Sequence, residues 1–195
     1  MPRLFTAIEV PANAALMLSM LRGGLPGARW IDAENYHITL RFIGDVDRHT
    51  ANEVSERLAR INRTSFQIRI NALDAFGGNK PHSVHARVER TPQLMELQGE
   101  HERIMQRIGL KAEGRKFLPH VTLARLRNAK GADVANYLSL RGNFSLPPFT
   151  ANRFVLYSSR DSVGGGPYIV EDAYPLDAGS GSRRSALDLR SSPAW

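Results

Sequence analysis

Two short stretches with the same alternating pattern constrain this chain more than any other feature. Residues 37–40 read His-Ile-Thr-Leu, and residues 120–123 read His-Val-Thr-Leu. Alternation of polar and apolar residues is typical of a half-buried β-strand, because successive side chains on a strand point to opposite faces. Each stretch therefore predicts a strand that carries an imidazole and a hydroxyl on one face, with aliphatic side chains behind them. One such match carries little information, whereas two copies with aliphatic residues at the same positions indicate a shared role.

The rest of the chain repeats the same order of elements in its two halves. The first half predicts strand 4–10, helix 14–21, the strand that begins at His37, helix 48–61 and strand 66–75. The second half predicts strand 83–88, helix 92–108, the strand that begins at His120, helix 133–140 and strand 149–159, with a hairpin to strand 168–175. This is a repeat of pattern and not of sequence. Two similar lobes that face each other would bring the two polar faces together across one cleft.

Composition bounds the domain organisation, the compartment and the partners. Residues 1–177 are expected to form one domain, and residues 178–195, which are rich in Gly, Ser and Arg, a flexible tail. A formal net charge of +7 favours a polyanionic partner such as nucleic acid or another phosphate ester. The absence of cysteine excludes disulfides, thiolate metal sites and a cysteine nucleophile, and fits a reducing cytoplasm. No apolar run is long enough to cross a bilayer, so we expect a cytoplasmic protein without a membrane partner. We separately expect the protein to be a monomer.

A pair of imidazoles suits displacement at phosphorus, which proceeds in line with the attacking and leaving oxygens on opposite sides. One neutral histidine can take a proton from water, and one protonated histidine can give a proton to the leaving oxygen. The hydroxyls of Thr39 and Thr122 can donate hydrogen bonds to the non-bridging oxygens. Arg41 or Arg125 could add charge-assisted hydrogen bonds. The residues therefore favour cleavage of a phosphodiester without a metal ion or another cofactor.

Two points remain open at the level of the residues alone. A metal site is the chemical rival, although neither motif contains a second histidine or a carboxylate at ligand spacing. Strict alternation also places Arg125 on the face opposite His120. A bulge or a strand end after Leu123 is needed to turn Arg125 towards the motif.

Four segments carry a resemblance to a known family: residues 3–8, 37–44, 117–125 and 154–159. With them the chain resembles the 2H phosphoesterase superfamily, and in particular the RNA 2′,3′-cyclic phosphodiesterases, which are also known as LigT-like 2′-5′ RNA ligases. The resemblance implies an α+β fold of two pseudo-symmetric lobes, with antiparallel sheets flanked by helices around a central cleft. It also implies opening of an RNA 2′,3′-cyclic phosphate to a 2′-phosphate, with a possible reverse 2′-5′ joining reaction. By motif, His37 would be the proton donor and His120 the proton acceptor. Thr39, Thr122 and Arg125 would bind the phosphate.

Two positions depart from the family pattern, and two other functions stay open. Leu118 stands where relatives often have a basic residue, and His85 stands where relatives often have Trp. The alternatives are a non-catalytic protein that binds RNA ends or nucleotides, and a related enzyme for another cyclic or 2′-5′-linked nucleotide. Among the remaining rings, Phe5, Trp30 and Tyr157 are interpreted as core residues rather than base-stacking platforms.

Two further histidines fall in segments that are predicted to be helical. His49 falls in the predicted helix 48–61 and His101 in the predicted helix 92–108. Both are expected at the surface.

Overall fold

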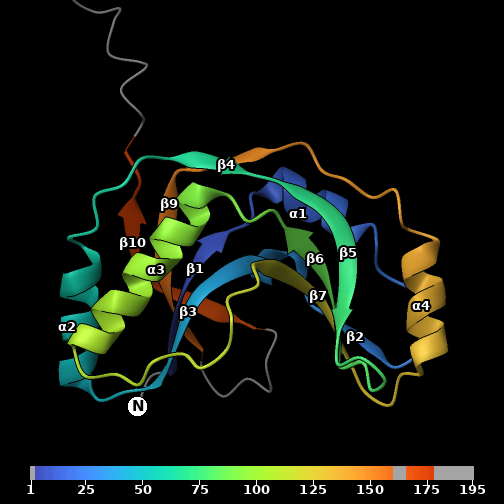
Figure 1. The fold of residues 1–195 in the computed structure, drawn as a ribbon, viewed down its shortest axis with the longest axis horizontal. Helices are drawn as coiled ribbons and strands as arrows, with labels where there is room; N and C mark the ends of the chain where they lie inside the picture. Colours follow the sequence, from blue (N-terminus) through green and yellow to red (C-terminus); the bar gives the residue numbers. More distant parts are fainter. Residues whose placement is uncertain (1–2, 160–165, 178–195) are drawn as a thin grey trace, which may run out of the picture.

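The two strands that carry the His-x-Thr motifs lie next to each other in the middle of one large sheet. The structure is a computed structural model that describes residues 3–159 and 166–177. Its main sheet has eight strands in the order β10-β9-β1-β3-β7-β6-β5, with β2 also paired to β7 (Figure 1). Every pair in this sheet is antiparallel.

The elements follow the predicted order closely. The strands are β1 (Arg3–Glu9), β2 (Ala28–Trp30), β3 (His37–Asp45), β4 (Phe66–Ile68), β5 (Ile70–Phe76), β6 (Ser83–Val88), β7 (His120–Leu126), β8 (Phe149–Ala151), β9 (Arg153–Ser159) and β10 (Tyr168–Pro175). The helices are α1 (Ala12–Ser19), α2 (Arg48–Leu58), α3 (Pro92–Arg107) and α4 (Gly131–Ser139), with the short 3-10 helix η1 (Ala33–Asn35) before β3.

Two long strands predicted from the sequence are each divided. The segment 66–75 becomes β4 and β5, and the segment 149–159 becomes β8 and β9. The reason is that β4 and β8 pair with each other in a separate two-stranded sheet, so each chain segment passes from the small sheet to the large one at a single residue. The β9–β10 pairing agrees with the predicted hairpin, but its connection, 160–165, and the predicted tail, 178–195, lie outside the described residues.

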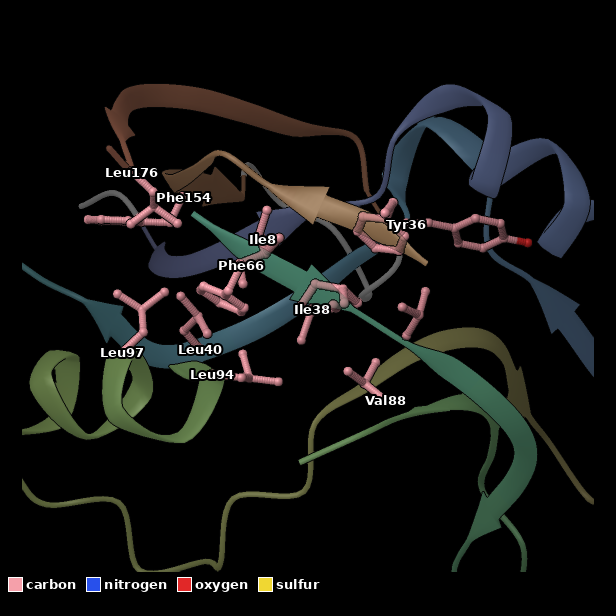
Figure 2. Packing of buried hydrophobic residues seen from close by; sticks show 14 of the residues in the cluster. Ile8, Tyr36, Ile38, Leu40, Phe66, Val88, Leu94, Leu97, Phe154 and Leu176 are labelled. Carbon is pink, nitrogen blue, oxygen red and sulfur yellow. The ribbon is translucent and has the colours of Figure 1, made fainter. Parts of the chain in front are cut away.

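The back face of the motif strands is the centre of the hydrophobic core. Ile38 and Leu40 of β3 are buried and pack in one cluster with Leu94 and Leu97 of α3 (Figure 2). Helix α3 begins where the sequence signals it, since the Thr91 hydroxyl accepts a hydrogen bond from the Leu94 amide and a proline follows at the first helical position. Each such aliphatic side chain contributes about 1.5–3 kcal/mol by burial, which holds the opposite, polar face of the strand in place.

The pattern repeat corresponds to two halves of the fold. The series β1-α1-β3-α2-β4 is followed by β6-α3-β7-α4-β8, and the halves meet where Ile38 of β3 pairs with Val121 of β7. The small β4–β8 sheet joins the same two halves at a second place. The predicted α+β class with antiparallel sheets and flanking helices is confirmed. Among the described residues, no helix has the length and apolar character needed to span a bilayer.

The prediction that His101 lies at the surface is wrong. His101 of α3 is fully buried, and its Nδ1 lies 2.8 Å from the hydroxyl of Thr6 on β1. Its ring packs against Phe154, with 4.6 Å between the centroids. The residue falls on the inner face of α3, which is covered because α3 lies against the back of the sheet. Burial lowers the pKa of His101 from 6.5 to about 3, so the ring is neutral in the folded protein.

We expect this buried ring to make stability depend on pH. Between its unfolded pKa of 6.5 and its folded pKa of about 3, the unfolded chain binds a proton at His101 that the folded chain does not. The free energy of unfolding should therefore fall as the pH falls through this window, by up to about 1.4 kcal/mol per pH unit from this residue. His101→Gln keeps a polar partner for Thr6 but cannot titrate. Urea unfolding between neutral pH and about pH 5 should give a shallower pH dependence for His101→Gln than for the wild type, and equal slopes would contradict the assignment.

Candidate active site

The β3–β7 pair brings both motifs to one face of the sheet. Because Ile38 is the partner of Val121 in an antiparallel pair, His37 comes opposite Thr122 and His120 comes opposite Thr39 when the register is continued. Each imidazole thus faces the hydroxyl of the other motif. The two histidines occupy diagonal positions, which in a regular sheet separates their Cβ atoms by about 7–8 Å. That spacing leaves room for a small group between the rings.

Both motif strands contain a bulge at the same place, directly after the threonine. In β3, Thr39 pairs with Ala7 and Arg41 with Thr6, so Leu40 has no partner in the register. In β7, Thr122 pairs with His85 and Ala124 with Val84, so Leu123 has none. The two strands consequently share one burial pattern, in which alternation is followed by two successive buried residues and then an exposed one. A bulge shifts the alternation by one residue and re-aims every side chain after it.

The bulge in β7 turns Arg125 to the side of the histidines. Arg125 pairs with Ser83, which shares a face with His85 and therefore with Thr122. Its charge acts on the ring of His37, where it lowers the pKa. The bulge at Leu123 is therefore the irregularity that is needed to bring Arg125 to the face of His120. Arg125 is exposed, so its guanidinium can be reached by an anionic ligand.

The bulge in β3 sends Arg41 the other way. Arg41 is 7% exposed, forms an ion pair with Glu102 of α3 and donates to the carbonyl of Lys111. It therefore ties α3 and the connection before β7 to the back of the sheet and is not available to a ligand on the site face. In β3 the position equivalent to Arg125 is held by Phe42, which is 47% exposed. One half of the site thus offers a cation where the other offers an aromatic ring.

The two histidine rings are oriented in the same way. His37 Nδ1 lies 2.8 Å from the carbonyl oxygen of Asn35, and His120 Nδ1 lies 2.7 Å from the carbonyl oxygen of Leu118. A carbonyl oxygen can only accept a hydrogen bond, so each Nδ1 carries the proton and donates it. The Nε2 atom of each neutral ring then holds the free lone pair. Both motifs therefore present the nitrogen that can take up or deliver a proton.

Aromatic rings surround His37. Phe5, Tyr157 and Tyr168 lie 5.1, 5.9 and 5.1 Å from its ring, measured between centroids. Phe5 and Tyr157 are buried, which agrees with their interpretation as core residues; here they form the wall behind the imidazole. Burial is the main cause that lowers the pKa of His37 to about 4, while its bond to the Asn35 carbonyl opposes this effect. His37 is therefore neutral near pH 7 in the substrate-free protein.

A second aromatic group lies beside His120. Phe76 and His85 lie 4.9 and 5.1 Å from its ring, both with their planes steeply inclined to it. Burial lowers the pKa of His120, and the bond to the Leu118 carbonyl opposes the change. Trp30, the third ring considered above, packs instead against Tyr137 in a separate core cluster. Each imidazole is thus held between a backbone carbonyl and an aromatic wall.

The side chains brought together can act on an anion by moving protons. Two imidazoles with free Nε2 atoms, two hydroxyls and a guanidinium share one face, which suits acid–base chemistry at a phosphoryl group. In the described part of the chain, no three His, Cys, Asp or Glu side chains are grouped so that they could hold a metal ion. The fold and this set of groups define a phosphoesterase-type protein.

Comparison with known proteins identifies the family. Residues 8–85 and 87–168 match the model of the LigT-like phosphoesterases. The chain is 40% identical over 119 residues to an RNA 2′,3′-cyclic phosphodiesterase of Aeropyrum pernix, a match that covers 60% of this chain and 67% of the relative. It is 31% identical over 177 residues to an RNA 2′,3′-cyclic phosphodiesterase of Thermotoga maritima, covering 86% and 92% of the two chains. The crystal structure of Escherichia coli LigT in complex with 3′-AMP superposes with a TM-score of 0.72 at 26% identity, covering 90% of this chain and 99% of that one. This chain belongs to the LigT-like phosphoesterase family.

The hydrogen bonds and burial of the two rings predict their protonation states directly. At neutral pH, nitrogen-15 NMR of the histidine side chains should show His37 and His120 with the proton on Nδ1 and a bare Nε2. On acidification the His37 ring should stay neutral to roughly pH 5, because its pKa is about 4. A His37 ring that is already protonated well above pH 5, or that carries its proton on Nε2 at neutral pH, would contradict this geometry.

Proposed function

We propose that this protein is an RNA 2′,3′-cyclic phosphodiesterase that opens a terminal cyclic phosphate to a 2′-phosphate. The observation that carries the proposal is the pair of Nδ1-anchored imidazoles, which the Ile38–Val121 pair holds on one face of the sheet. Relatives from several bacteria and archaea bear the name RNA 2′,3′-cyclic phosphodiesterase, which supports the same substrate class. The net charge of +7 favours a polyanionic substrate such as RNA.

The reaction needs one proton acceptor and one proton donor on opposite sides of the phosphorus atom. His120 Nε2 takes a proton from a water molecule as its oxygen bonds to phosphorus. The bond from phosphorus to the ribose 3′ oxygen breaks, and His37 gives its proton to that oxygen. Thr39 and Thr122 donate hydrogen bonds to the non-bridging oxygens, and Arg125 adds a charge-assisted bond. The products are a free 3′ hydroxyl and a 2′-phosphate.

The substrate itself supplies the condition that makes His37 a donor. In the free protein the pKa of His37 is about 4, and the charges of His120 and Arg125 contribute to this low value. A bound phosphodiester carries a negative charge that favours the protonated ring and offsets the guanidinium of Arg125. The donor is therefore charged only when an anion is present, which couples substrate binding to protonation.

The same geometry also accounts for a joining reaction. If the 5′ hydroxyl of a second RNA end takes the place of water, its oxygen bonds to phosphorus while the 3′ oxygen leaves, and a 2′-5′ linkage results. The acceptor and the donor have the same roles whether the nucleophile is water or the 5′ hydroxyl.

We further propose that the protein acts as a monomer in the cytoplasm, where the absence of cysteine fits the reducing conditions.

The direct test uses a short RNA that ends in a 2′,3′-cyclic phosphate, with EDTA in the buffer. We expect the wild type to yield only the 2′-phosphate, identified by chromatography against both monophosphate standards. His37→Ala and His120→Ala should each lower kcat/KM by about 10²–10⁴-fold, because each removes one proton transfer. His49→Ala, on the exposed face of α2, should leave it unchanged.

Three outcomes would count against this function. Tight binding of the RNA without product would favour a protein that only binds RNA ends. Turnover only of a 2′-5′-linked dinucleotide or another cyclic nucleotide would favour a related enzyme with a different substrate. Activity that appears only after Zn²⁺ or Mn²⁺ is added would argue against proton transfer by the two imidazoles alone.

The separate roles of the two histidines can be tested through the leaving group. A p-nitrophenyl phosphodiester releases a stable anion, so its cleavage needs no proton donor. On this substrate His37→Ala should recover most of the wild-type rate, whereas His120→Ala should remain impaired. The same recovery in His120→Ala instead would show that the roles are reversed.

A further inference from the structure

A third histidine lies in the site beside the two of the motifs. His85 of β6 is the register partner of Thr122, and cross-strand partners in an antiparallel pair share a face. Its ring stacks on Phe76, with 4.0 Å between centroids and planes 20° apart, and it meets the edge of the His120 ring at 5.1 Å. These contacts fix the ring next to both a predicted acceptor and a predicted phosphate-binding hydroxyl.

The His85 ring has an unused hydrogen-bonding capacity. Its Nδ1 is buried and has no hydrogen-bond partner in the described part of the chain, and the residue as a whole is only 3% exposed. Nε2 is not among the buried atoms that lack a partner, and the ring lies on the site face as the cross-strand partner of Thr122. An orphaned buried N–H is rarer than an orphaned acceptor, which favours the tautomer with a bare Nδ1 and a proton on Nε2. His85 therefore carries its N–H donor on Nε2.

Positive charge gathers at the same place. Arg87 is the register partner of His120 and lies on the site face of β6, and its charge acts on His85. Arg125 lies further along β7 on the same face. Asp74 of β5 is the register partner of His85, and its negative charge opposes the effect of positive charge on the ring, but its carboxylate accepts a hydrogen bond from the Ala75 amide. A donor N–H among cations suits a phosphate oxygen.

We propose that His85 is a substrate-binding residue that donates a hydrogen bond from Nε2 to a phosphate oxygen, next to the hydroxyl of Thr122. The proposal rests on the proposed function, because the phosphate is that of the RNA end. It gives the acceptor half of the site one imidazole more than the motifs supply. It also gives a function to a polar ring at a buried position.

The test replaces the ring without changing its stacking. His85→Phe keeps an aromatic ring against Phe76 and His120 but removes both nitrogens. We expect kcat/KM for the cyclic-phosphate RNA to fall about 10- to 100-fold, as for loss of one hydrogen bond to a charged group. Affinity for adenosine 2′-monophosphate, measured by calorimetry, should fall by a similar factor. The melting temperature should stay equal or rise, since an isolated buried polar atom is removed.

Two further variants separate hydrogen bonding from packing. His82→Phe is the matched control, because the exposed His82 also stacks on Phe76, at 6.3 Å; it should leave turnover and affinity unchanged. His85→Gln loses the ring but keeps an amide donor, and it should retain more affinity for adenosine 2′-monophosphate than His85→Phe.

The results that would overturn the inference are distinct from failure of the proposed function. Wild-type kcat/KM and affinity in His85→Phe would refute the role of His85 while the activity of the protein stands. A loss in His85→Phe that is accompanied by a lower melting temperature and shared by His82→Phe would assign the effect to packing and refute it as well. If the wild type does not cleave the RNA, the proposed function fails, and weaker nucleotide binding by His85→Phe would still support the donor.

Discussion

The pairing of Ile38 with Val121 is the contact on which the rest of the site depends. It is the single register pair between β3 and β7, and beyond it the edge of β7 is taken over by β2. Both side chains are fully buried on the back face of the sheet. The site is therefore assembled by hydrophobic packing behind the polar face. Since each motif strand is also the inner strand of its own half, the two halves and the two imidazoles come together through one contact.

Much of this arrangement could be predicted from the residues, and the exceptions have a common origin. The alternation at His37 and Thr39 gave their shared face correctly, because the period of a strand is a local property of the chain. The position of Arg125 required a bulge at Leu123, and nothing in an aliphatic residue marks it as the extra residue of a bulge. The surface position predicted for His101 is wrong for a similar reason, because which face of α3 is buried depends on the sheet against which the helix packs. Local pattern predicts elements and faces, while tertiary partners decide where the pattern is interrupted.

The symmetry of the two motifs is broken in a way that assigns different environments to similar residues. His37 lies among three aromatic side chains and near a guanidinium, whereas His120 lies beside another imidazole and Phe76. Two residues after the bulged leucine, β7 has the cation Arg125 and β3 has the exposed phenyl ring of Phe42. A reaction that needs one acceptor and one donor benefits from such differences, because identical surroundings would give the two rings identical proton affinities. The repeat therefore supplies the scaffold, and its departures supply the division of roles.

Burial of three imidazoles on one face has an energetic consequence that also bears on function. The pKa of each of His37, His85 and His120 is lowered, with burial as the largest cause, so all three rings are held neutral at neutral pH. A buried polar ring with an unpartnered nitrogen is less stable than an apolar ring of the same shape. Such a cost is tolerated where a ligand completes the hydrogen bonds, and an anion is the ligand that would raise the proton affinity of every ring at once. The site face thus has the electrostatic properties expected of a site that binds a negatively charged group.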